Sequence, residues 1–255
     1  MHPPRSPPNG RADGIGEVAS NATPAMPLVD CIVPTFNSAR YLREALDSIL
    51  AQTYRSLEII VADDSSTDGT VAIAEAYGVR VVTQPTAGPA ATRNLGLRAT
   101  TRDFVAFLDA DDVWHPEKLS RQMARFELNP ELEVSFTHAR VFWETDLAAE
   151  AERLRRHRRA DSVPAYVTGA MVARRRVFET VGLLDPTLWF VDALEWYERA
   201  VQRGVVIELL PETLLNKRLH PSSITRRLEP ASRKEFIHLV RTHLRRRPLH
   251  GNAPD

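Results

Sequence analysis

Two clusters of aspartate residues are the part of the sequence best suited to chemistry. Each cluster directly follows an apolar run, and the members are Asp63, Asp64, Asp109, Asp111 and Asp112. Carboxylates that lie close together raise one another's pKa, and a divalent cation relieves that repulsion. Carboxylate oxygens suit Mg²⁺ or Mn²⁺ as ligands. The clusters therefore predict a metal site. The alternative is helix capping by Asp64, Asp109 or Asp112, and for Asp68 capping is the preferred interpretation.

The elements that must position these carboxylates alternate between strand and helix. Buried strands are expected at 29–33, 57–62, 79–82 and 104–108. Helices are expected from a cap at Asn37 or Ser38 to Leu50, at Gly69–Tyr77, at Pro89–Ala99 and from Pro116 onward. Strands that are apolar at nearly every residue are typical of a parallel sheet covered on both faces. In such a sheet ligands bind at the carboxyl ends of the strands, where both acidic clusters lie.

The second half of the sequence has a less regular pattern. Strands are expected at Leu132–Trp143, at Tyr166–Val172 and at Val205–Leu210, where Pro211 ends the last one. Helices are expected at Arg174–Val181 and Ala193–Gln202. A final helix has an apolar seam formed by Phe236, Val240 and Leu244. This helix is expected to pack on the domain. The alternative is a weak peripheral contact of its basic side chains with anionic lipid.

Composition excludes several classes of protein. The chain has 255 residues, with 33 basic and 33 acidic ones, so the balanced charge argues against nucleic-acid binding. Cys31 is alone, which excludes an internal disulfide and a cysteine-rich metal site. No apolar stretch reaches membrane-spanning length and no signal-peptide pattern is present, so a cytoplasmic location is expected. Residues 1–26 and 245–255 read as tails that flank one domain at 27–244.

Four segments in order resemble the successive motifs of family 2 glycosyltransferases. They are Val33–Asn37, Val61–Gly69, Ala91–Asn94 and Phe107–Asp112. Each falls at a strand end or in the following helix, and the similarity extends from about Val29 to Ser223. The resemblance implies the GT-A fold, an α/β architecture with a mostly parallel sheet flanked by helices. In this fold a nucleotide-binding half is joined to an acceptor-binding half.

The resemblance also implies how a nucleotide-sugar donor binds. The loop after the first strand would lie against the nucleotide, and Asp64 would accept a hydrogen bond from its base. Arg93 would lie near the diphosphate, with an exposed helix arginine as the alternative. The full donor set implied is Pro34, Thr35, Asn37, Asp64, Arg93, Asp109 and Ala110.

The Asp-X-Asp triplet of the family holds the metal ion that bridges the diphosphate. The resemblance therefore implies that Asp109 and Asp111 bind Mn²⁺ or Mg²⁺, and that His220 completes the ligand set. Asp112 either contributes to the site or caps the next helix. Lys217 and Arg218 would gather positive charge beside the phosphates.

The catalytic base is the point at which the chain departs from the family pattern. Alignment on Arg199 and Gly204 places the family's acidic pair at Asp192-Ala193, so alanine stands where the basic aspartate is expected. Asp192 is the preferred base and Glu195 is the second candidate. Ordinary helix-start carboxylates remain the alternative for both.

Three further residues are expected to shape the acceptor or sugar pocket. They are Trp114, Gly169 and Trp196. Trp114 follows the acidic triplet, although core packing is an equally good interpretation of a tryptophan. Gly169 belongs to a stretch of small residues that would leave room for a sugar.

The sequence therefore predicts a metal-dependent, inverting glycosyltransferase that uses a nucleotide sugar, with UDP as the expected nucleotide. The acceptor hydroxyl belongs to a glycan, a lipid-linked sugar or a peptide. One alternative is a catalytically impaired relative that binds nucleotide sugars or glycans, which Ala193 would explain. The other is a nucleotidyltransferase, but those enzymes usually have a glycine-rich basic loop after the first strand, unlike Pro34–Asn37.

Overall fold

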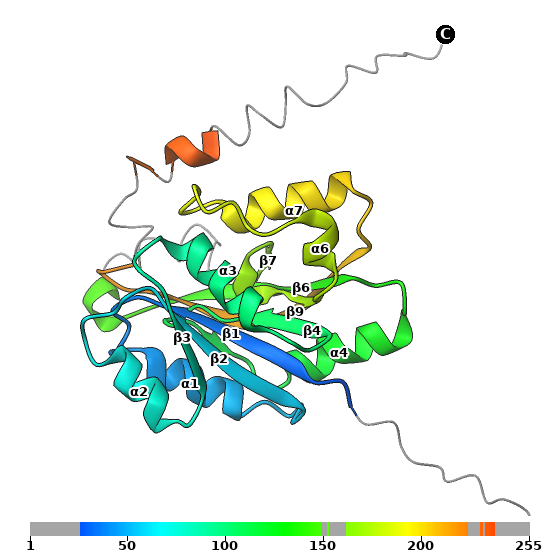
Figure 1. Cartoon of the computed structure of the whole chain (residues 1–255). Helices are drawn as coiled ribbons and strands as arrows, with labels where there is room; N and C mark the ends of the chain where they lie inside the picture. Colours follow the sequence, from blue (N-terminus) through cyan, green and yellow to red (C-terminus); the bar gives the residue numbers. More distant parts are fainter. Residues whose placement is uncertain (1–25, 149–151, 153–161, 224–229, 232, 238–255) are drawn as a thin grey trace, which may run out of the picture.

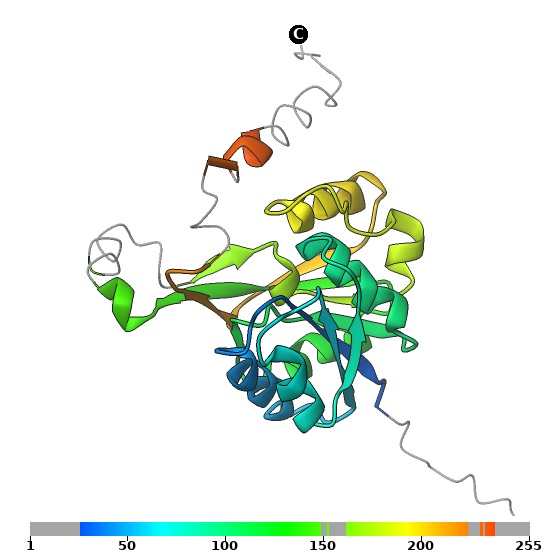
Figure 2. The same ribbon diagram turned by 60° about the vertical axis from the view of Figure 1, so that its left-hand side comes forward.

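The computed structural model describes residues 26–148, 152, 162–223, 230–231 and 233–237. These residues form a twisted mixed sheet with helices on both faces (Figure 1). Helices α1 and α2 lie on one face, and α3, α6 and α7 lie on the other. The turned view in Figure 2 shows the same separation. The α/β fold expected from the alternating sequence pattern is therefore present.

The strands carry most of the predicted segments. Their bounds are β1 Val29–Thr35, β2 Leu57–Asp63, β3 Arg80–Thr83, β4 Phe104–Phe107, β5 Val113–Trp114, β6 Val134–Trp143, β7 Val163–Ala165, β8 Val172–Arg174 and β9 Ile207–Leu219. The helices are α1 Leu42–Leu50, α2 Thr70–Ala76, α3 Pro89–Ala99, α4 Lys118–Leu128, α6 Val177–Val181 and α7 Asp192–Gln202. Two 3₁₀ turns cover Thr145–Leu147 and Thr168–Ala170.

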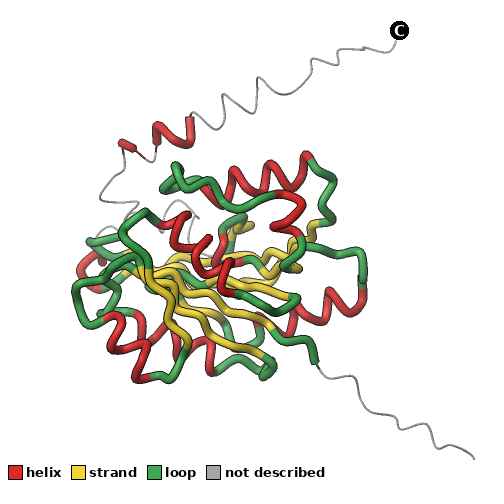
Figure 3. Tube along the Cα trace, viewed as in Figure 1, coloured by secondary structure: helices red, strands yellow, loops and turns green. Residues whose placement is uncertain are grey.

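The sheet has two parts that differ in strand direction. Along the main path the order is β3-β2-β1-β4-β8-β6-β9-β5, and β7 pairs with β6. The pairings among β3, β2, β1 and β4 are all parallel, as predicted for the first half. In the second half β8 is antiparallel to both β4 and β6, whereas β6 and β9 are parallel. Figure 3 shows the strands in yellow, running side by side through the middle of the molecule. The mostly parallel character therefore belongs to the first four strands of the path.

Close packing holds the first half together. Burial of β1 is almost complete, and burial raises the pKa of the Cys31 thiol to about 12. A Cβ placed on Gly96 of α3 would lie 2.3 Å from Cγ2 of Ile32 in β1. The absence of a side chain at Gly96 is what allows α3 to approach the sheet this closely.

The predicted cap of α1 is wrong. Neither Asn37 nor Ser38 caps this helix, which starts after Tyr41 without a side-chain hydrogen bond at its cap. Asn37 has φ of 48° and accepts a hydrogen bond from Thr67 N instead. The polar residue after β1 therefore joins two loops rather than starting a helix. Asp68 does accept from Thr70 N at the start of α2, as preferred.

Two predicted strand boundaries also differ from the structure. The segment expected as a single strand at Tyr166–Val172 contains a 3₁₀ turn at Thr168–Ala170 before β8 begins. Pro211 does not end the strand that precedes it. β9 continues through Pro211 because a bulge lies there, with Leu210 opposite Thr137 and Thr213 opposite His138. A bulge is a position where the missing N–H of proline costs no ladder hydrogen bond.

Several predictions fall outside the described residues. They include nearly all of residues 1–26, the tail at 245–255 and the apolar seam of the last helix beyond Ile237. Within the part of the chain that the structure describes, no helix is both long enough and apolar enough to cross a membrane.

Candidate active site

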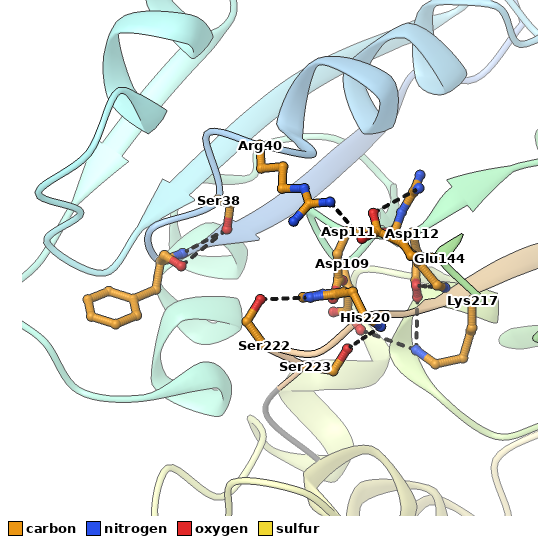
Figure 4. A network of polar contacts seen from close by, with 12 residues as sticks. Ser38, Arg40, Asp109, Asp111, Asp112, Glu144, Lys217, His220, Ser222 and Ser223 are labelled. Carbon is orange, nitrogen blue, oxygen red and sulfur yellow. Dashed lines mark hydrogen bonds and ion pairs between the residues drawn. The ribbon is translucent and has the colours of Figure 1, made fainter. Parts of the chain in front are cut away.

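The parallel strands bring the two acidic clusters to one edge of the sheet. Half-buried Pro34 and buried Thr35 end β1, and Thr35 pairs in register with Asp63 at the end of β2. β4 ends at Phe107 next to β1. The chain then carries the second cluster to the region drawn in Figure 4, and this cluster comprises Asp109, Ala110, Asp111 and Asp112.

Asp63 connects the loops that follow β1 and β2. Its carboxylate accepts from Thr35 Oγ1 at 2.9 Å and from Ser66 N at 2.8 Å. Asn37 N donates to Ser66 Oγ at 2.8 Å, and Thr67 N donates to Asn37 Oδ1 at 2.8 Å. The loop expected to face a nucleotide is therefore held by the chain's own hydrogen bonds.

Asp64 holds the loop between β3 and α3. The residue is 3% exposed, and its carboxylate accepts a hydrogen bond from Gln84 Nε2 at 2.9 Å. It also accepts from the backbone N–H groups of Ala87 and Gly88, both at 2.9 Å. Gly88 has φ of 91°, and a Cβ there would lie 3.1 Å from the ring of Trp189. Asp64 therefore positions a loop that contacts the second half of the molecule. This role is additional to the predicted hydrogen bond from Asp64 to the nucleotide base.

Arg93 connects the acidic triplet to the start of α7. Its guanidinium donates to Asp109 Oδ1 at 2.7 Å and to Asp192 Oδ2 at 2.8 Å. Arg93 is 8% exposed, so the interpretation as an exposed helix arginine is wrong. Its Nε is buried and has no hydrogen-bond partner among the described residues. Burial would raise the pKa of Asp109, but Arg93 and Lys217 outweigh it and hold that pKa at about 2.

The basic residues of β9 are paired with carboxylates. Lys217 Nζ lies 2.8 Å from Asp112 Oδ2 and 3.6 Å from Asp109 Oδ2. Burial would lower the pKa of Lys217, but the neighbouring aspartates outweigh it and raise that pKa. Arg218 N donates to Asp112 Oδ1, and the guanidinium of Arg218 pairs with Glu44.

Asp112 therefore ties the acidic loop to β9. It is 1% exposed, and both of its carboxylate oxygens are occupied by the β9 donors just described. Helix α4 begins after Glu117 and has no side-chain hydrogen bond at its cap. The helix-cap alternative for Asp112 is therefore wrong, and its contribution to a metal site stays a prediction.

Asp111 is the most accessible aspartate of the cluster, and it lies beside His220 (Figure 4). His220 Nε2 lies 3.0 Å from Asp111 Oδ2, and its Nδ1 lies 2.8 Å from Ser222 Oγ. The His220 ring is 4.5 Å from that of Tyr41 between centroids. The side chain of Asp111 is 34% exposed, whereas that of His220 is 7% exposed. A carboxylate open to solvent is thus held beside an oriented imidazole.

The spacing of Asp111 and His220 fits a small divalent cation, and the metal role of Asp109 stays a prediction. Neighbouring ligands around an octahedral ion with bonds of about 2.1 Å lie about 3 Å apart, which matches the Asp111–His220 separation. Among the described residues no group of three or more His, Cys, Asp or Glu side chains could hold a metal ion. Asp109 faces Arg93 and Lys217 instead. One or two protein ligands are enough for Mg²⁺ when substrate phosphates supply the rest.

The first turn of α7 places the two candidate bases in different surroundings. Asp192 is 4% exposed and its carboxylate faces Arg93. Burial raises the pKa of Asp192, Arg93 opposes that rise and Asp109 adds to it. Glu195 is paired with Arg199 Nε at 2.8 Å, and Arg199 is held in turn by the carbonyl of Val181. Only Asp192 belongs to the network of the acidic triplet.

The three residues predicted for the sugar or acceptor pocket lie in the core instead. Trp114 is 2% exposed and donates from Nε1 to Gly169 O at 2.9 Å, which confirms the packing alternative. Trp196 is 1% exposed and donates to Gly182 O. A Cβ on Gly169 would lie 3.3 Å from Leu215, so this glycine leaves no free space for a sugar. Large aromatic side chains at helix and strand starts are buried here because their N–H groups find carbonyl partners.

A cleft of about 510 Å³ lies beside the first turn of α7. Its described lining residues are Tyr166, Val167, Phe190, Val191, Ala193, Leu194, Arg233 and Phe236. Ala193, which the resemblance aligned with the family's base, thus lines this cleft. Sequence reasoning missed the cleft, because its walls come from separate segments that are far apart in the chain.

Sequence reasoning also missed the pairing of Arg93 with Asp192 and of Lys217 with Asp112. Each pair joins residues about a hundred positions apart, as the numbering shows. The equal numbers of acidic and basic residues allow such pairing but do not indicate the partners. General principles predict that a buried aspartate will lie beside a cation, but they do not say which cation in the sequence it will be.

Comparison with known protein families decides the classification. The family model described as glycosyl transferase family 2 matches residues 30–182, which is more than half of the chain. The chain belongs to glycosyl transferase family 2. The resemblance seen in the four motifs is thus confirmed, and the nucleotidyltransferase alternative loses its support.

Curated relatives of this family 2 chain are similar over part of their length. An uncharacterized glycosyltransferase of Rickettsia prowazekii is 40% identical over 99 residues, which are 38% of this chain and 31% of that protein. The putative teichuronic acid biosynthesis glycosyltransferase TuaG of Bacillus subtilis is 37% identical over 117 residues, 44% of this chain and 46% of that protein. The chain therefore matches about a third to a half of the length of these two relatives.

Solved structures confirm the predicted GT-A fold. S. aureus TarS in complex with UDP-GlcNAc superposes with a TM-score of 0.64 and 21% identity, covering 77% of this chain and 60% of that one. The mannosyltransferase PcManGT from Pyrobaculum calidifontis, in complex with GDP-Man and Mn²⁺, gives a TM-score of 0.66 and 22% identity. That match covers 89% of this chain and 66% of PcManGT.

Proposed function

We propose that this chain transfers a sugar from a nucleoside-diphosphate sugar to a hydroxyl group, with a divalent cation and with inversion at the anomeric carbon. The observation that carries the proposal is the network Asp111–His220, Asp109–Arg93–Asp192 and Asp112–Lys217 at the carboxyl edge of the sheet. It combines an accessible carboxylate, two cations paired with aspartates and a candidate base. UDP is the nucleotide that we favour, because UDP and UDP-GlcNAc occupy TarS, a neighbour in fold.

The donor side of the network suits a diphosphate. Asp111 and His220 would hold Mg²⁺ or Mn²⁺, with phosphate oxygens and water as the remaining ligands. The chemistry that such an ion supplies is neutralisation of the charge that grows on the leaving diphosphate. Lys217 and Arg93 keep Asp109 ionised and lie close enough to exchange partners when an anionic group arrives. Mn²⁺ in the PcManGT structure supports this assignment.

The acceptor side of the network suits a base. As the acceptor oxygen forms its bond to the anomeric carbon, its proton passes to a carboxylate, and the bond from that carbon to the diphosphate breaks. Asp192 is our candidate, because it joins the donor network through Arg93. Burial raises its pKa towards the range in which a carboxylate is an effective base. Attack on the side opposite the leaving group inverts the anomeric centre.

The test is release of nucleoside diphosphate from a panel of nucleotide sugars, including UDP-GlcNAc and GDP-Man, with and without Mn²⁺. We expect slow release from one donor, and stronger release with the metal. Calorimetry should then show that Asp111→Asn weakens metal-supported UDP binding about tenfold or more. Asp103→Asn, at an exposed position outside the network, is the matched control. Equal metal-supported affinities in wild type and Asp111→Asn would remove the metal assignment.

A second candidate function is a catalytically impaired relative that binds nucleotide sugars. Ala193 favours it, because the family's base position holds a methyl group that faces an apolar cleft. Ala193→Asp separates the two candidates. A gain of transfer or hydrolysis in that variant, from an inactive wild type, would establish the impaired relative. If the wild type is active and Ala193→Asp changes its transfer rate little, the result supports Asp192 as the base.

A further inference from the structure

Among the described residues that line the cleft beside α7, one side chain is charged and the others are apolar or aromatic. Seven of these eight residues are aliphatic or aromatic, and the eighth is Arg233. The volume of about 510 Å³ falls within the range of about 300–1,000 Å³ that small-molecule sites occupy. Tyr166, the polar-tipped member of the wall, packs its ring on Tyr197 with centroids 4.4 Å apart. The cleft therefore offers a ligand apolar contact and one positive charge.

The segment that carries Arg233 is held against the loop before α7. Glu235 accepts hydrogen bonds from Trp189 N at 3.2 Å and from Phe190 N at 3.0 Å. Arg233 and Phe236 are three residues apart in a helical segment, so both face the same side. Among the described residues Arg233 forms no ion pair. Its guanidinium is thus available to an anionic group at the edge of the cleft.

The cleft lies directly beside the proposed base. Val191 and Ala193 both line it, and Asp192 stands between them with its carboxylate on Arg93. Arg93 in turn contacts Asp109 at the donor edge. A molecule seated in the cleft therefore reaches the first turn of α7, which any acceptor hydroxyl must approach under the proposed function.

The chemistry of the walls discriminates among acceptors. A glycan or peptide packed on these walls would find few hydrogen-bond partners, and each hydroxyl or amide group that it buried there without a partner would cost free energy. A hydrocarbon chain loses nothing of this kind and gains from removal of apolar surface from water. A phosphate group at the end of such a chain would pair with Arg233 through charge-assisted hydrogen bonds.

We propose that the cleft binds the acceptor, and that the acceptor is an amphiphile in which an apolar chain is joined to a sugar through phosphate. The chain occupies the cleft, the phosphate faces Arg233, and the sugar hydroxyl approaches Asp192. This assignment rests on the proposed function, because it identifies the acceptor class of the same site.

The test uses the full chain and calorimetric titration with three probes: farnesyl phosphate, farnesol and inorganic phosphate. We expect farnesyl phosphate to bind more tightly than either of the others, because only it has both chemical parts. Arg233→Gln should weaken farnesyl phosphate binding about tenfold or more without affecting farnesol. Phe236→Ala should weaken both. The neighbours that do not line the cleft supply matched controls, Lys234→Gln and Ile237→Ala, which should bind like wild type.

Three outcomes would overturn the assignment. They are equal binding of farnesyl phosphate and inorganic phosphate, equal losses in Arg233→Gln and Lys234→Gln, and tighter binding of an oligosaccharide than of farnesyl phosphate. Titration with UDP-GlcNAc and GDP-Man in Mn²⁺ separates this failure from failure of the proposed function. Donor binding without farnesyl phosphate binding rejects the amphiphile alone, whereas absence of both rejects the proposed function itself.

Discussion

The first half of the sheet (β1 to β4), called here the donor half because we propose that the sugar donor binds there, differs from the region around α7. The two regions hold their candidate functional residues in different ways. At the ends of β1, β2 and β4, carboxylates such as Asp63 and Asp64 are saturated by donors from neighbouring loops. Around α7, the described walls of the cleft are mainly apolar, and Ala193 is among them. The loops at the ends of β1, β2 and β4 are thus organised before any ligand arrives. The cleft beside α7 offers apolar surface with Arg233 as its charged residue among those described.

The largest effect in this comparison is expected at the residue that joins the two regions. Asp192→Asn should lower transfer by about two to four orders of magnitude, while donor and metal binding stay nearly unchanged. Steady-state kinetics and calorimetry together measure this. Glu195→Gln is the control and should do much less, because Glu195 is paired with Arg199. A crippling effect of Glu195→Gln would move the base one helical turn along α7.

The same residue predicts a pH dependence. Burial raises the pKa of Asp192, and only its deprotonated form accepts a proton. Transfer should therefore decline as pH falls through that raised pKa, at a higher pH than an exposed aspartate would give. The decline should be absent from the residual rate of Asp192→Asn. An unchanged acidic limb in that variant would contradict the assignment.

A second effect concerns Lys118, the buried first residue of α4. Its Nζ donates to Gln122 Oε1 at 2.8 Å and lies 4.3 Å from the centroid of the Trp114 ring. Burial lowers the pKa of Lys118 to about 7. Since the unfolded chain holds this proton up to about pH 10.4, the stabilising contribution of Lys118 rises with pH between those values.

The measurement is the free energy of unfolding at pH 7 and pH 9 in wild type and Lys118→Met. The free energy of unfolding of wild type, relative to that of Lys118→Met, should rise by about 2–3 kcal/mol from pH 7 to pH 9. Lys234→Met, at an exposed position, should leave the pH dependence unaltered. Parallel pH profiles of wild type and Lys118→Met would show that Lys118 keeps its proton in the folded protein.

A third, smaller effect tests how rigidly the donor half is packed. Gly96→Ala should destabilise the protein by about 1–3 kcal/mol, because the new Cβ would lie 2.3 Å from Ile32 Cγ2. Gly69→Ala is the matched control, since its Cβ would be 3.8 Å from the nearest atom, Ala39 Cβ. Denaturant unfolding measures both. Equal stabilities of the two variants would mean that α3 moves easily away from β1.

The smallest effect is expected outside both regions. Removal of residues 1–25 should leave the melting temperature and donor binding unchanged. The first described contacts of the chain start at Met26, whose carbonyl accepts from Ser56 Oγ, and at Pro27, whose carbonyl accepts from Tyr54. Thermal unfolding with and without UDP measures both properties. A lower melting temperature after the removal would place part of residues 1–25 on the domain.

Much of the donor half was predictable because its signals are local. Apolar runs followed by Asp63-Asp64 and by the Asp109–Asp112 cluster indicated parallel strands with polar ends, and the structure has β2 and β4 there. Parallel strands place their carboxyl ends at one edge of the sheet, so residues far apart in the chain meet without any knowledge of side-chain contacts. The four motifs of the family added the expected donor and metal roles.

Other features of the site depended on partners that no local pattern identifies. Trp114 and Trp196 pack in the core because carbonyls of other segments accept their N–H groups. Pro211 continues a strand because a bulge opposite β6 accommodates it. Each outcome depends on a partner in another segment of the chain. The spacing of residues in the sequence does not identify that partner.

The sequence by itself thus determined the strand–helix alternation, the acidic edge and the family, since all three follow from residue types in consecutive order. The tertiary structure alone decided that Arg93 joins Asp109 to Asp192, that Asp112 holds β9, and that Ala193 faces an apolar cleft. The physical reason is that ion pairing and burial depend on distances between segments remote in the chain. Only the packing of α3 and α7 against the sheet, and the position of β9 within it, set those distances.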